Sequence, residues 1–233
     1  GYSGTAVLTR KEPLNVTYDF GDDEHRHEGR IITAELPGAS AKVSMLARSL
    51  DAFMNAGYVY VGMDHFALPE DALAVAKRQG RLHRNFQGYS TQPDCDLIGL
   101  GVSAIGRVGA TYSQNAKTLE EYYDFIDQGR LPVVRGLALS RDDLVRRTVI
   151  MALMCQGEVL FEPVDQAWLI DFRTYFAAEL EQLREMQGQG LVRVNDDGIE
   201  VTALGWFFVR GVAMVFDRYL QADRNRARFS RII

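Results

Sequence analysis

Residues 40–62, SAKVSMLARSLDAFMNAGYVYVG, carry the pattern that decides the fold of the first half of the chain. Apolar residues recur there at helical spacing between Ser40, a suitable N-cap, and Gly57, a suitable helix stop. The β-branched and aromatic run Tyr58–Gly62 follows directly and predicts a strand. A helix followed at once by a short strand is typical of α/β folds, so we expect part of a parallel sheet or barrel.

The same alternation extends on both sides of this stretch. Pro69 can open a second helix that ends near Gly80, and the apolar run Asp96–Gly101 predicts a second strand. Toward the N-terminus, Thr5–Thr9 and Arg30–Leu36 are short runs with β composition, too small to fold alone. We therefore expect an N-terminal β fragment ahead of the α/β part.

The period of the apolar residues changes after Ser140. Ser140 and Asp143 have the spacing of a capping box, and the helix that follows has a face formed by Leu144, Thr148, Met151 and Cys155. Pro163 suits a first helical turn, and a further stripe predicts a helix that ends near Gly188, with Leu169, Phe172, Phe176, Leu180 and Leu183.

A hairpin and a last helix complete this second pattern. Leu191–Val194 and Ile199–Val201 flank Asn195-Asp196-Asp197-Gly198, which predicts a tight turn. Thr202 can cap a final helix with an apolar stripe of Leu204, Phe207, Phe208, Val212, Val215 and Tyr219. Two helices, a hairpin and a helix predict a mostly helical, winged-helix-like domain.

Composition excludes several classes of protein. The chain has 233 residues, 47% of them hydrophobic and 24% charged, with a net charge of −5, which excludes disorder and argues against a protein that mainly neutralises nucleic-acid phosphates. No uncharged apolar stretch approaches the roughly 20 residues of a membrane span, and no cleavable signal is evident, so we expect a cytoplasmic location.

Two cysteines, Cys95 and Cys155, sit in apolar company, so we expect buried thiols in a reducing compartment. An iron–sulfur cluster needs three or four thiolates, which this chain cannot supply. His25 and His27 are read as surface residues because no third ligand accompanies them. We therefore predict no metal site.

The segment Met63–Ala67 is the first candidate site. Asp64 and His65 follow the strand Tyr58–Gly62 directly, and loops at the C-terminal ends of parallel strands build the sites of such folds. Both side chains suit general acid–base or hydrogen-bonding work. The alternative is a capped turn with a structural histidine.

The segment His83–Gln92 is the second candidate. It combines Arg84 with amides and aromatic rings, a mixture that suits a flat ligand with carboxylates, although a polar connecting loop looks similar. The glycine-rich Gly99–Gly106 would let backbone approach such a ligand, or form only a turn.

A basic tail ends the chain, with Arg224, Arg226, Arg228 and Arg231. Residues 136–233 nevertheless have a net charge of −2, so nucleic-acid binding is not expected of the helical domain. A non-enzymatic module that binds a partner or nucleic acid through this tail remains the alternative from another class.

Several long motif blocks follow one another from about Ser40 to the C-terminus, including AGYVYVGMDHFALPEDALA, GRLHRNFQGYSTQ, CDLIGLGVSAIG, LPVVRGLALSRDDLVRRTVIMALMC and VTALGWFFVRGVAMVFDRYL. In this order they closely resemble oxygen-independent coproporphyrinogen III oxidases, radical S-adenosylmethionine enzymes of haem biosynthesis. The resemblance implies the C-terminal part of a partial (β/α) barrel followed by the helical domain. It also implies oxidative decarboxylation of coproporphyrinogen III to protoporphyrinogen IX, with S-adenosyl-L-methionine, a 4Fe-4S cluster and an electron acceptor that the sequence does not identify.

Site residues follow from the same resemblance. Phe86, Gln87 and Ile105 match residues that line a second S-adenosylmethionine position, so they should face one cavity. Asp64 and His65 are typical of the family, with a catalytic role assigned by inference. Cations are needed to bind a tetra-anionic substrate, and the candidates for pairing its propionates are Arg81, Arg84 and Arg107.

The chain departs from the family in its first residues. The three cysteines of the family's cluster motif and its glycine-rich cofactor motif are missing. Residues 1–36 instead resemble an internal piece of exonuclease III-type apurinic endonucleases, without that family's catalytic motifs. We therefore expect a join near Leu36–Ser40, which a natural fusion, a gene-assembly error or an engineered fusion would explain equally.

Three segments result: a β fragment over 1–36, the C-terminal part of a radical S-adenosylmethionine barrel over 37–135, and a helical domain over 136–233. Because the cluster cysteines are missing, we expect the chain alone to be catalytically inactive. A remnant of an abasic-site endonuclease is the third reading.

Overall fold

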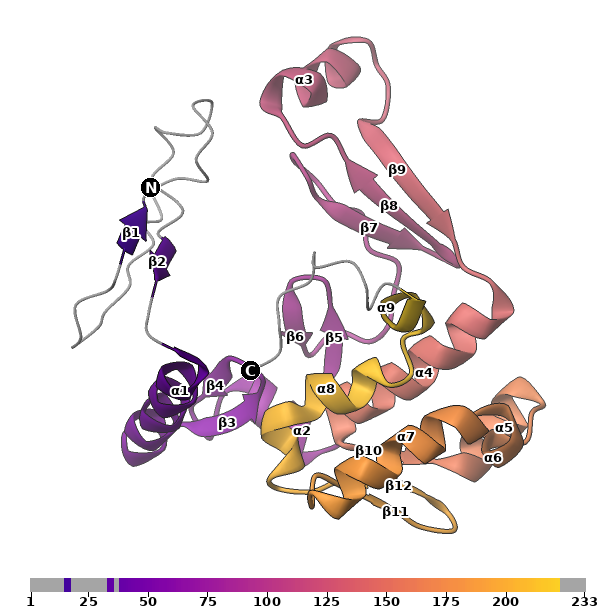
Figure 1. Cartoon of the computed structure of the whole chain (residues 1–233). Helices are drawn as coiled ribbons and strands as arrows, with labels where there is room; N and C mark the ends of the chain where they lie inside the picture. The colour runs from indigo at the N-terminus through magenta and orange to yellow at the C-terminus, as the bar shows by residue number, and fades with distance from the viewer. Residues whose placement is uncertain (1–14, 18–32, 36–37, 223–233) are drawn as a thin grey trace. The chain divides into compact units, whose positions relative to one another are not determined.

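A computed structural model describes residues 15–17, 33–35 and 38–222, which divide into two units at Gly57 and Tyr58 (Figure 1). In the first unit, β1 (Asn15–Thr17) pairs antiparallel with β2 (Thr33–Glu35). β2 confirms the strand predicted within Arg30–Leu36. Thr5–Thr9, His25, His27 and the four arginines of the basic tail lie outside the described residues.

The predicted first helix is confirmed as α1 (Gly38–Asn55), which begins at Gly38 rather than after a cap at Ser40. Gly57 follows it with φ +87°, the left-handed geometry that the predicted stop requires.

The second unit begins with two antiparallel hairpins. β3 (Val59–Gly62) pairs with β4 (His65–Ala67), and β5 (His83–Asn85) pairs with β6 (Gly88–Ser90). Between them lies α2 (Ala72–Arg78), which is capped by Asp71. The prediction that Pro69 begins this helix is wrong. The strand at Tyr58–Gly62 is confirmed, but its neighbour runs antiparallel because Met63, at φ +54°, turns the chain straight back.

All strand pairs among the described residues are antiparallel, including the sheet β7-β8-β9. Its strands and the neighbouring helix α3 are short: β7 (Ile105–Val108), β8 (Thr111–Asn115), α3 (Leu119–Asp127) and β9 (Val133–Ala138). The expectation of parallel pairing is thus wrong for this part of the chain, although mixed helices and strands remain as an open α/β fragment.

The predicted strand Asp96–Gly101 is also wrong. Within it, Leu97 alone forms a bridge, to Arg107, and the rest is irregular. The buried Asn115 side chain donates hydrogen bonds to the carbonyls of Gly99 (3.0 Å) and Gly101 (2.9 Å). These carbonyls are therefore not available to a sheet ladder.

The predicted winged-helix-like domain is present. Helix α4 leads to a strand, then to three helices and a hairpin, and the three strands form an antiparallel sheet in the order β10-β12-β11. The elements are α4 (Arg141–Gln156), β10 (Glu158–Leu160), α5 (Phe161–Trp168), α6 (Phe172–Tyr175), α7 (Ala177–Gly188), β11 (Val192–Val194) and β12 (Gly198–Val201). The hairpin around residues 195–198 is confirmed.

Two predicted helical stripes are interrupted. Leu169 ends α5 at φ +50° and is 87% exposed, so it lies on no common stripe with Phe172. The Thr202 hydroxyl oxygen accepts the Gly205 N–H at 2.9 Å, but Leu204 rather than Thr202 occupies the N-cap position of the next segment. That segment is not one helix but three short ones: η2 (Gly205–Phe208), α8 (Val209–Met214) and α9 (Arg218–Ala222).

The core of this domain forms between α4 and a group of aromatic rings. The buried face of α4 includes Val145, Val149 and Leu153. Of the predicted face, Cys155 is buried, whereas Leu144, Thr148 and Met151 are half-buried. Phe172 is fully buried, with ring centroids 4.3 Å from Phe161 and 4.8 Å from Phe176. The aromatic half of the predicted stripe is therefore core.

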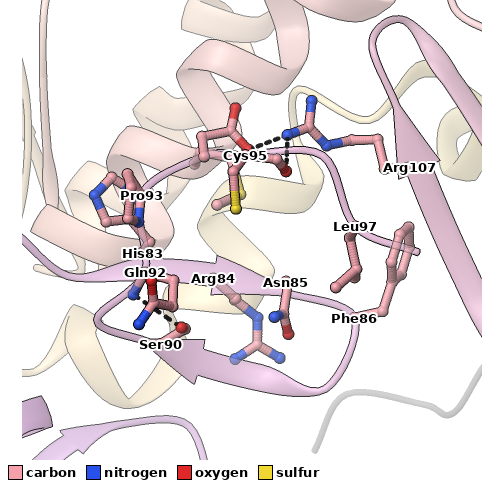
Figure 2. Close-up of a pocket in the computed structure, with 12 residues that line it drawn as sticks. His83, Arg84, Asn85, Phe86, Ser90, Gln92, Pro93, Cys95, Leu97 and Arg107 are labelled. Carbon is pink, nitrogen blue, oxygen red and sulfur yellow. Dashed lines mark hydrogen bonds and ion pairs between the residues drawn. The ribbon is translucent and has the colours of Figure 1, made fainter. Parts of the chain in front are cut away.

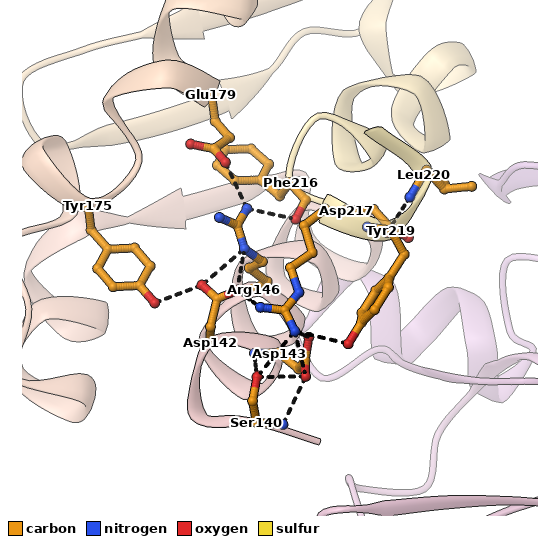
Figure 3. Close-up of polar contacts among 11 residues, drawn as sticks. Ser140, Asp142, Asp143, Arg146, Tyr175, Glu179, Phe216, Asp217, Tyr219 and Leu220 are labelled. Atoms are coloured by element: carbon orange, nitrogen blue, oxygen red, sulfur yellow. Dashed lines mark hydrogen bonds and ion pairs between the residues drawn. The ribbon is translucent and has the colours of Figure 1, made fainter. Parts of the chain in front are cut away.

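Ion pairs and hydrogen bonds connect the first turns of α4 to neighbouring elements (Figure 3). The capping box of Ser140 and Asp143 is confirmed. Arg146 pairs with Asp142 at 3.0 Å and with Glu179 at 2.7 Å, which ties α4 to α7. Partial burial acts to raise the pKa of Asp142, but hydrogen bonds from Tyr175 and Arg146 outweigh it and keep that pKa below its ordinary value.

Candidate functional site

The hairpins β3-β4 and β5-β6 approach each other closely because two glycines leave room. A Cβ on Gly62 would lie 2.6 Å from the Tyr89 hydroxyl, and a Cβ on Gly88 would lie 2.6 Å from His65 Nε2. Both glycines have positive φ values, +153° and +138°, which disfavour other residues as well. The predicted residue His65 is thereby held against the second candidate segment.

His65 and Arg84 both contact the Tyr89 ring. The His65 ring meets Tyr89 edge-on, with centroids 5.2 Å apart, and the Arg84 guanidinium carbon lies 4.9 Å from the Tyr89 centroid. The structure therefore brings together the two segments in which we placed the candidate residues. Tyr89 is the group that joins them.

Asp64 projects into solvent beside His65. Its carboxylate oxygen lies 2.8 Å from His65 Nδ1, at ion-pair distance, although the contact lacks hydrogen-bond geometry and Nδ1 is buried. The Asp64 side chain is 85% exposed, whereas that of His65 is 28% exposed. An exposed acid next to a sheltered imidazole is an arrangement that can move a proton once a ligand orients it.

Tyr89 is held by a hydrogen bond from its hydroxyl to the Met154 carbonyl, at 2.8 Å and buried. Helix α4 ends at Gln156, so Met154 is among the residues whose carbonyls have no partner within the helix. Burial raises the pKa of Tyr89, which keeps its hydroxyl neutral and able to donate. Its role in the site is positional.

Two cavities lie next to this junction. The smaller, about 140 Å³, is drawn in Figure 2 and is lined by the β5–β6 hairpin, residues 92–95, Leu97, Arg107 and Met151. The larger, about 450 Å³, lies between the hairpin, α4 and the α8–α9 region. Four residues line both cavities: Arg84, Asn85, Phe86 and Met151.

Arg84 is the predicted cation that the structure places best. It lines both cavities, and its Nη1 is buried without a hydrogen-bond partner among the described residues. Phe86 lines both cavities too, is 50% exposed and meets the Tyr112 ring edge-on with centroids 5.1 Å apart. Arg84 and Phe86 therefore both contribute to the walls of these two cavities.

Arg107 already has a partner. Its Nη2 donates to Asp94 at 2.6 Å, and Arg147 donates two hydrogen bonds to the same carboxylate, each at 2.7 Å. Hydrogen bonds from Arg147 hold the pKa of Asp94 below its ordinary value. This cluster ties the loop before β7 to α4.

Five predicted residues line neither cavity: Asp64, His65, Arg81, Gln87 and Ile105. Arg81 is exposed and donates to Gln79, and Gln87 is exposed at the tip of the β5–β6 hairpin. Ile105 is half-buried at the start of β7. Of Phe86, Gln87 and Ile105, only Phe86 lines either cavity, and the shared cofactor role of the three stays a prediction.

The described residues do not fit an iron–sulfur cluster. Cys155 is buried, and burial raises the pKa of its thiol to about 12, whereas Cys95 is exposed, contrary to the prediction that both are buried. No three His, Cys, Asp or Glu side chains gather as a metal site within the described part of the chain.

Comparison with known proteins finds a family model that matches part of the chain. Residues 139–208 match the model of the HemN C-terminal domain. These residues are therefore similar to a HemN C-terminal domain. The matched segment starts just before α4 and ends with η2, so it contains the winged-helix-like sheet and its helices.

The similarity continues beyond this domain. The chain is 48% identical over 204 residues to the oxygen-independent coproporphyrinogen III oxidase of Pseudomonas aeruginosa and 45% identical over 204 residues to that of Escherichia coli. These alignments cover 88% of this chain but 44% and 45% of the two relatives. The chain therefore spans under half the length of these relatives.

A solved structure agrees with these relatives. It is described as coproporphyrinogen III oxidase (HemN) from Escherichia coli, a radical SAM enzyme, and is 46% identical with a TM-score of 0.76. The alignment covers 80% of this chain and 43% of that one. The resemblance of the chain to the C-terminal part of these oxidases is confirmed. The resemblance of residues 1–36 to an apurinic endonuclease stays a prediction.

Sequence reasoning missed several residues of this site. Tyr89 stood in the quoted segment but had no assigned role, and Asp94 and Arg147 gave no local signal because 53 positions separate them. Met63, with its positive φ, lies on the wall of the larger cavity. The position of Met63, a bulky residue in a tight turn next to Asp64, was the one sequence signal that could have marked it as a site residue.

No helix among the described residues combines the length and the apolar character needed to cross a bilayer.

Proposed function

We propose that this chain is the C-terminal portion of an oxygen-independent coproporphyrinogen III oxidase, a radical S-adenosylmethionine oxidoreductase of haem biosynthesis. The observation that carries the proposal is the 46% identity and TM-score of 0.76 to the solved oxidase over 80% of the chain. In the reaction of this family, two propionate side chains of coproporphyrinogen III lose carbon dioxide and become vinyl groups. The 4Fe-4S cluster belongs to the part of the relatives that this chain does not span.

The residues at the hairpin junction have roles in this proposal. Arg84 pairs a substrate propionate, since its buried Nη1 has no partner within the described structure. Asp64 and His65 hold or move a proton beside the reacting side chain. Phe86 shelters S-adenosylmethionine, the source of the radical chemistry when bound, with Gln87 and Ile105 as its expected neighbours.

Arg81 and Arg107 contribute less to substrate binding in this arrangement. Arg107 is already paired with Asp94, so a propionate would have to displace a carboxylate that accepts hydrogen bonds from two arginines. Arg81 is exposed and lines neither of the two cavities described. We rank Arg84 first among the three predicted cations.

A chimera tests this function. Residues 40–233 replace the matching part of the Pseudomonas aeruginosa oxidase, and anaerobic conversion of coproporphyrinogen III to protoporphyrinogen IX is measured. We expect conversion by the chimera and none by the relative without its C-terminal part. A folded, cluster-loaded chimera that converts no substrate would contradict the proposal.

The present chain alone should be inactive. After anaerobic incubation with iron, sulfide and S-adenosylmethionine, we expect neither stoichiometric cluster absorbance nor cleavage of S-adenosylmethionine, because the chain has two cysteines. Either signal at one equivalent per chain would overturn this expectation.

A further inference from the structure

The larger cavity has walls built mainly of flexible apolar side chains. Met63, Met151 and Met154 line it together with Ile150, Ala213 and Met214. Methionine side chains adapt their shape and contact aromatic rings favourably. Such walls suit a broad unsaturated ligand better than a small polar one.

Most polar side chains on these walls are engaged with the protein itself. Asn85 accepts a backbone N–H of its own hairpin at 2.9 Å, and the Tyr112 hydroxyl accepts from Arg147 at 3.1 Å. Asp217 accepts two backbone N–H groups at the start of α9, at 3.0 and 3.1 Å. Asp217 also brings negative charge to one end of the cavity, which disfavours a ligand carboxylate there.

Two guanidinium groups on the walls are not engaged in this way. Arg84 Nη1 is buried without a hydrogen-bond partner, and its residue lies on β5. Arg210 is exposed on α8, and no hydrogen bond or ion pair joins it to any described residue. A buried N–H of a cation is costly to leave unpaired, so the cavity is suited to a ligand that carries carboxylates.

We propose that the larger cavity binds an edge of a tetrapyrrole, with Arg84 and Arg210 each pairing a propionate and the methionine side chains contacting the pyrrole rings. This inference rests on the proposed function for its substrate class. It adds Arg210, a residue of the α8 region that no sequence motif singled out, as a substrate-positioning residue. The HemN C-terminal domain and the segment that follows it would thereby form part of the substrate site.

Direct binding tests the proposal without any turnover. Coproporphyrin III, the stable oxidised analogue with four propionates, is titrated into the full chain and followed by its absorbance and fluorescence. We expect saturable binding, which Arg84→Gln and Arg210→Gln each weaken about tenfold, because each loses a charge-assisted hydrogen bond. The tetramethyl ester of coproporphyrin III has no carboxylates. It should bind the wild-type chain no more tightly than it binds the double variant Arg84→Gln, Arg210→Gln.

Arg135→Gln is the matched control. Arg135 lies on β9, is exposed, lines neither of the two cavities and loses the same single charge. An equal loss of affinity in Arg135→Gln and Arg210→Gln would overturn the proposal, since general electrostatics would then explain the binding. Unchanged affinity in Arg210→Gln would overturn it as well.

The failure of this inference and that of the proposed function are distinguishable. Arg210 is exposed, so Arg210→Gln should unfold at the wild-type temperature, and loss of affinity in a folded protein supports a binding role. Absence of coproporphyrin binding to the folded wild-type chain overturns the cavity assignment. Conversion by the chimera would still support the enzyme family in that case.

Discussion

Replacement of Tyr89 by phenylalanine should destabilise the second unit by a measurable amount. The substitution removes the hydroxyl that donates to the Met154 carbonyl at 2.8 Å in a buried position. No N–H within α4 can replace this donor, because the helix ends two residues later at Gln156. A buried carbonyl without a partner costs about 1–3 kcal/mol.

This cost has an expected thermal signature. For a folded unit of about 150–250 residues, 1 kcal/mol corresponds to a shift in melting temperature of about 2–4 °C. We therefore expect Tyr89→Phe to melt about 2–12 °C below wild type in calorimetry, with a matching loss in urea unfolding. The aromatic ring stays, so its contacts with Arg84 and His65 are retained.

Tyr123→Phe is the control for the loss of a hydroxyl. Tyr123 is 56% exposed, and its hydroxyl makes no hydrogen bond to the described residues, so the free energy of unfolding should change by less than about 0.5 kcal/mol. If Tyr89→Phe and Tyr123→Phe differed by less than that amount, the hydroxyl of Tyr89 would not be the group that ties the β5–β6 hairpin to α4. The reasoning would then be refuted.

Three further substitutions test other parts of the fold. Gly88→Ala places a Cβ 2.6 Å from His65 Nε2 at a residue with φ +138°. It should lower the unfolding free energy by about 1–3 kcal/mol more than the control Gly109→Ala, because Gly109 also has a positive φ but open space around it. Equal losses for the two variants in urea unfolding would exclude the close contact. Ser140→Ala removes the N-cap of α4 and should cost about 1 kcal/mol in the same assay, and an unchanged midpoint would contradict the cap. Burial lowers the pKa of Lys77 to about 8, so above that pH the unfolded chain binds more protons than the folded chain. The unfolding free energy should therefore rise from pH 8 to pH 9 more steeply in wild type than in Lys77→Met. Parallel curves for the two proteins would contradict the lowered pKa.

Local chemistry explains which elements were predictable. The capping box of Ser140 and Asp143, the turn at residues 195–198 and the strand that became β3 each depend on side chains within a few positions of one another. Such signals act through nearby backbone groups, so they survive in any tertiary context. The ordered motif blocks from about Ser40 onward likewise indicate the similarity to the oxidases from the sequence alone.

Pairings between distant segments could not be predicted in the same way. Whether β3 meets a parallel or an antiparallel neighbour depends on the turn at Met63, and the carbonyls of residues 99 and 101 are taken by Asn115 rather than by a strand. Helical periodicity also continued through Leu169, where the chain in fact breaks. Periodicity reports which side chains are apolar, but not where the backbone ends a helix.

Local sequence patterns predicted the helices and turns that caps define, and they indicated the similarity to coproporphyrinogen oxidases and the candidate residues Asp64, His65, Arg84 and Phe86. The contacts of Arg84 and His65 with the same Tyr89 ring, and the pairing of Arg107 with Asp94, arise on folding. They depend on how separate segments pack, because packing determines which buried polar groups find partners. Tyr89 reaches a helix carbonyl 65 positions away, and no short-range pattern encodes that choice.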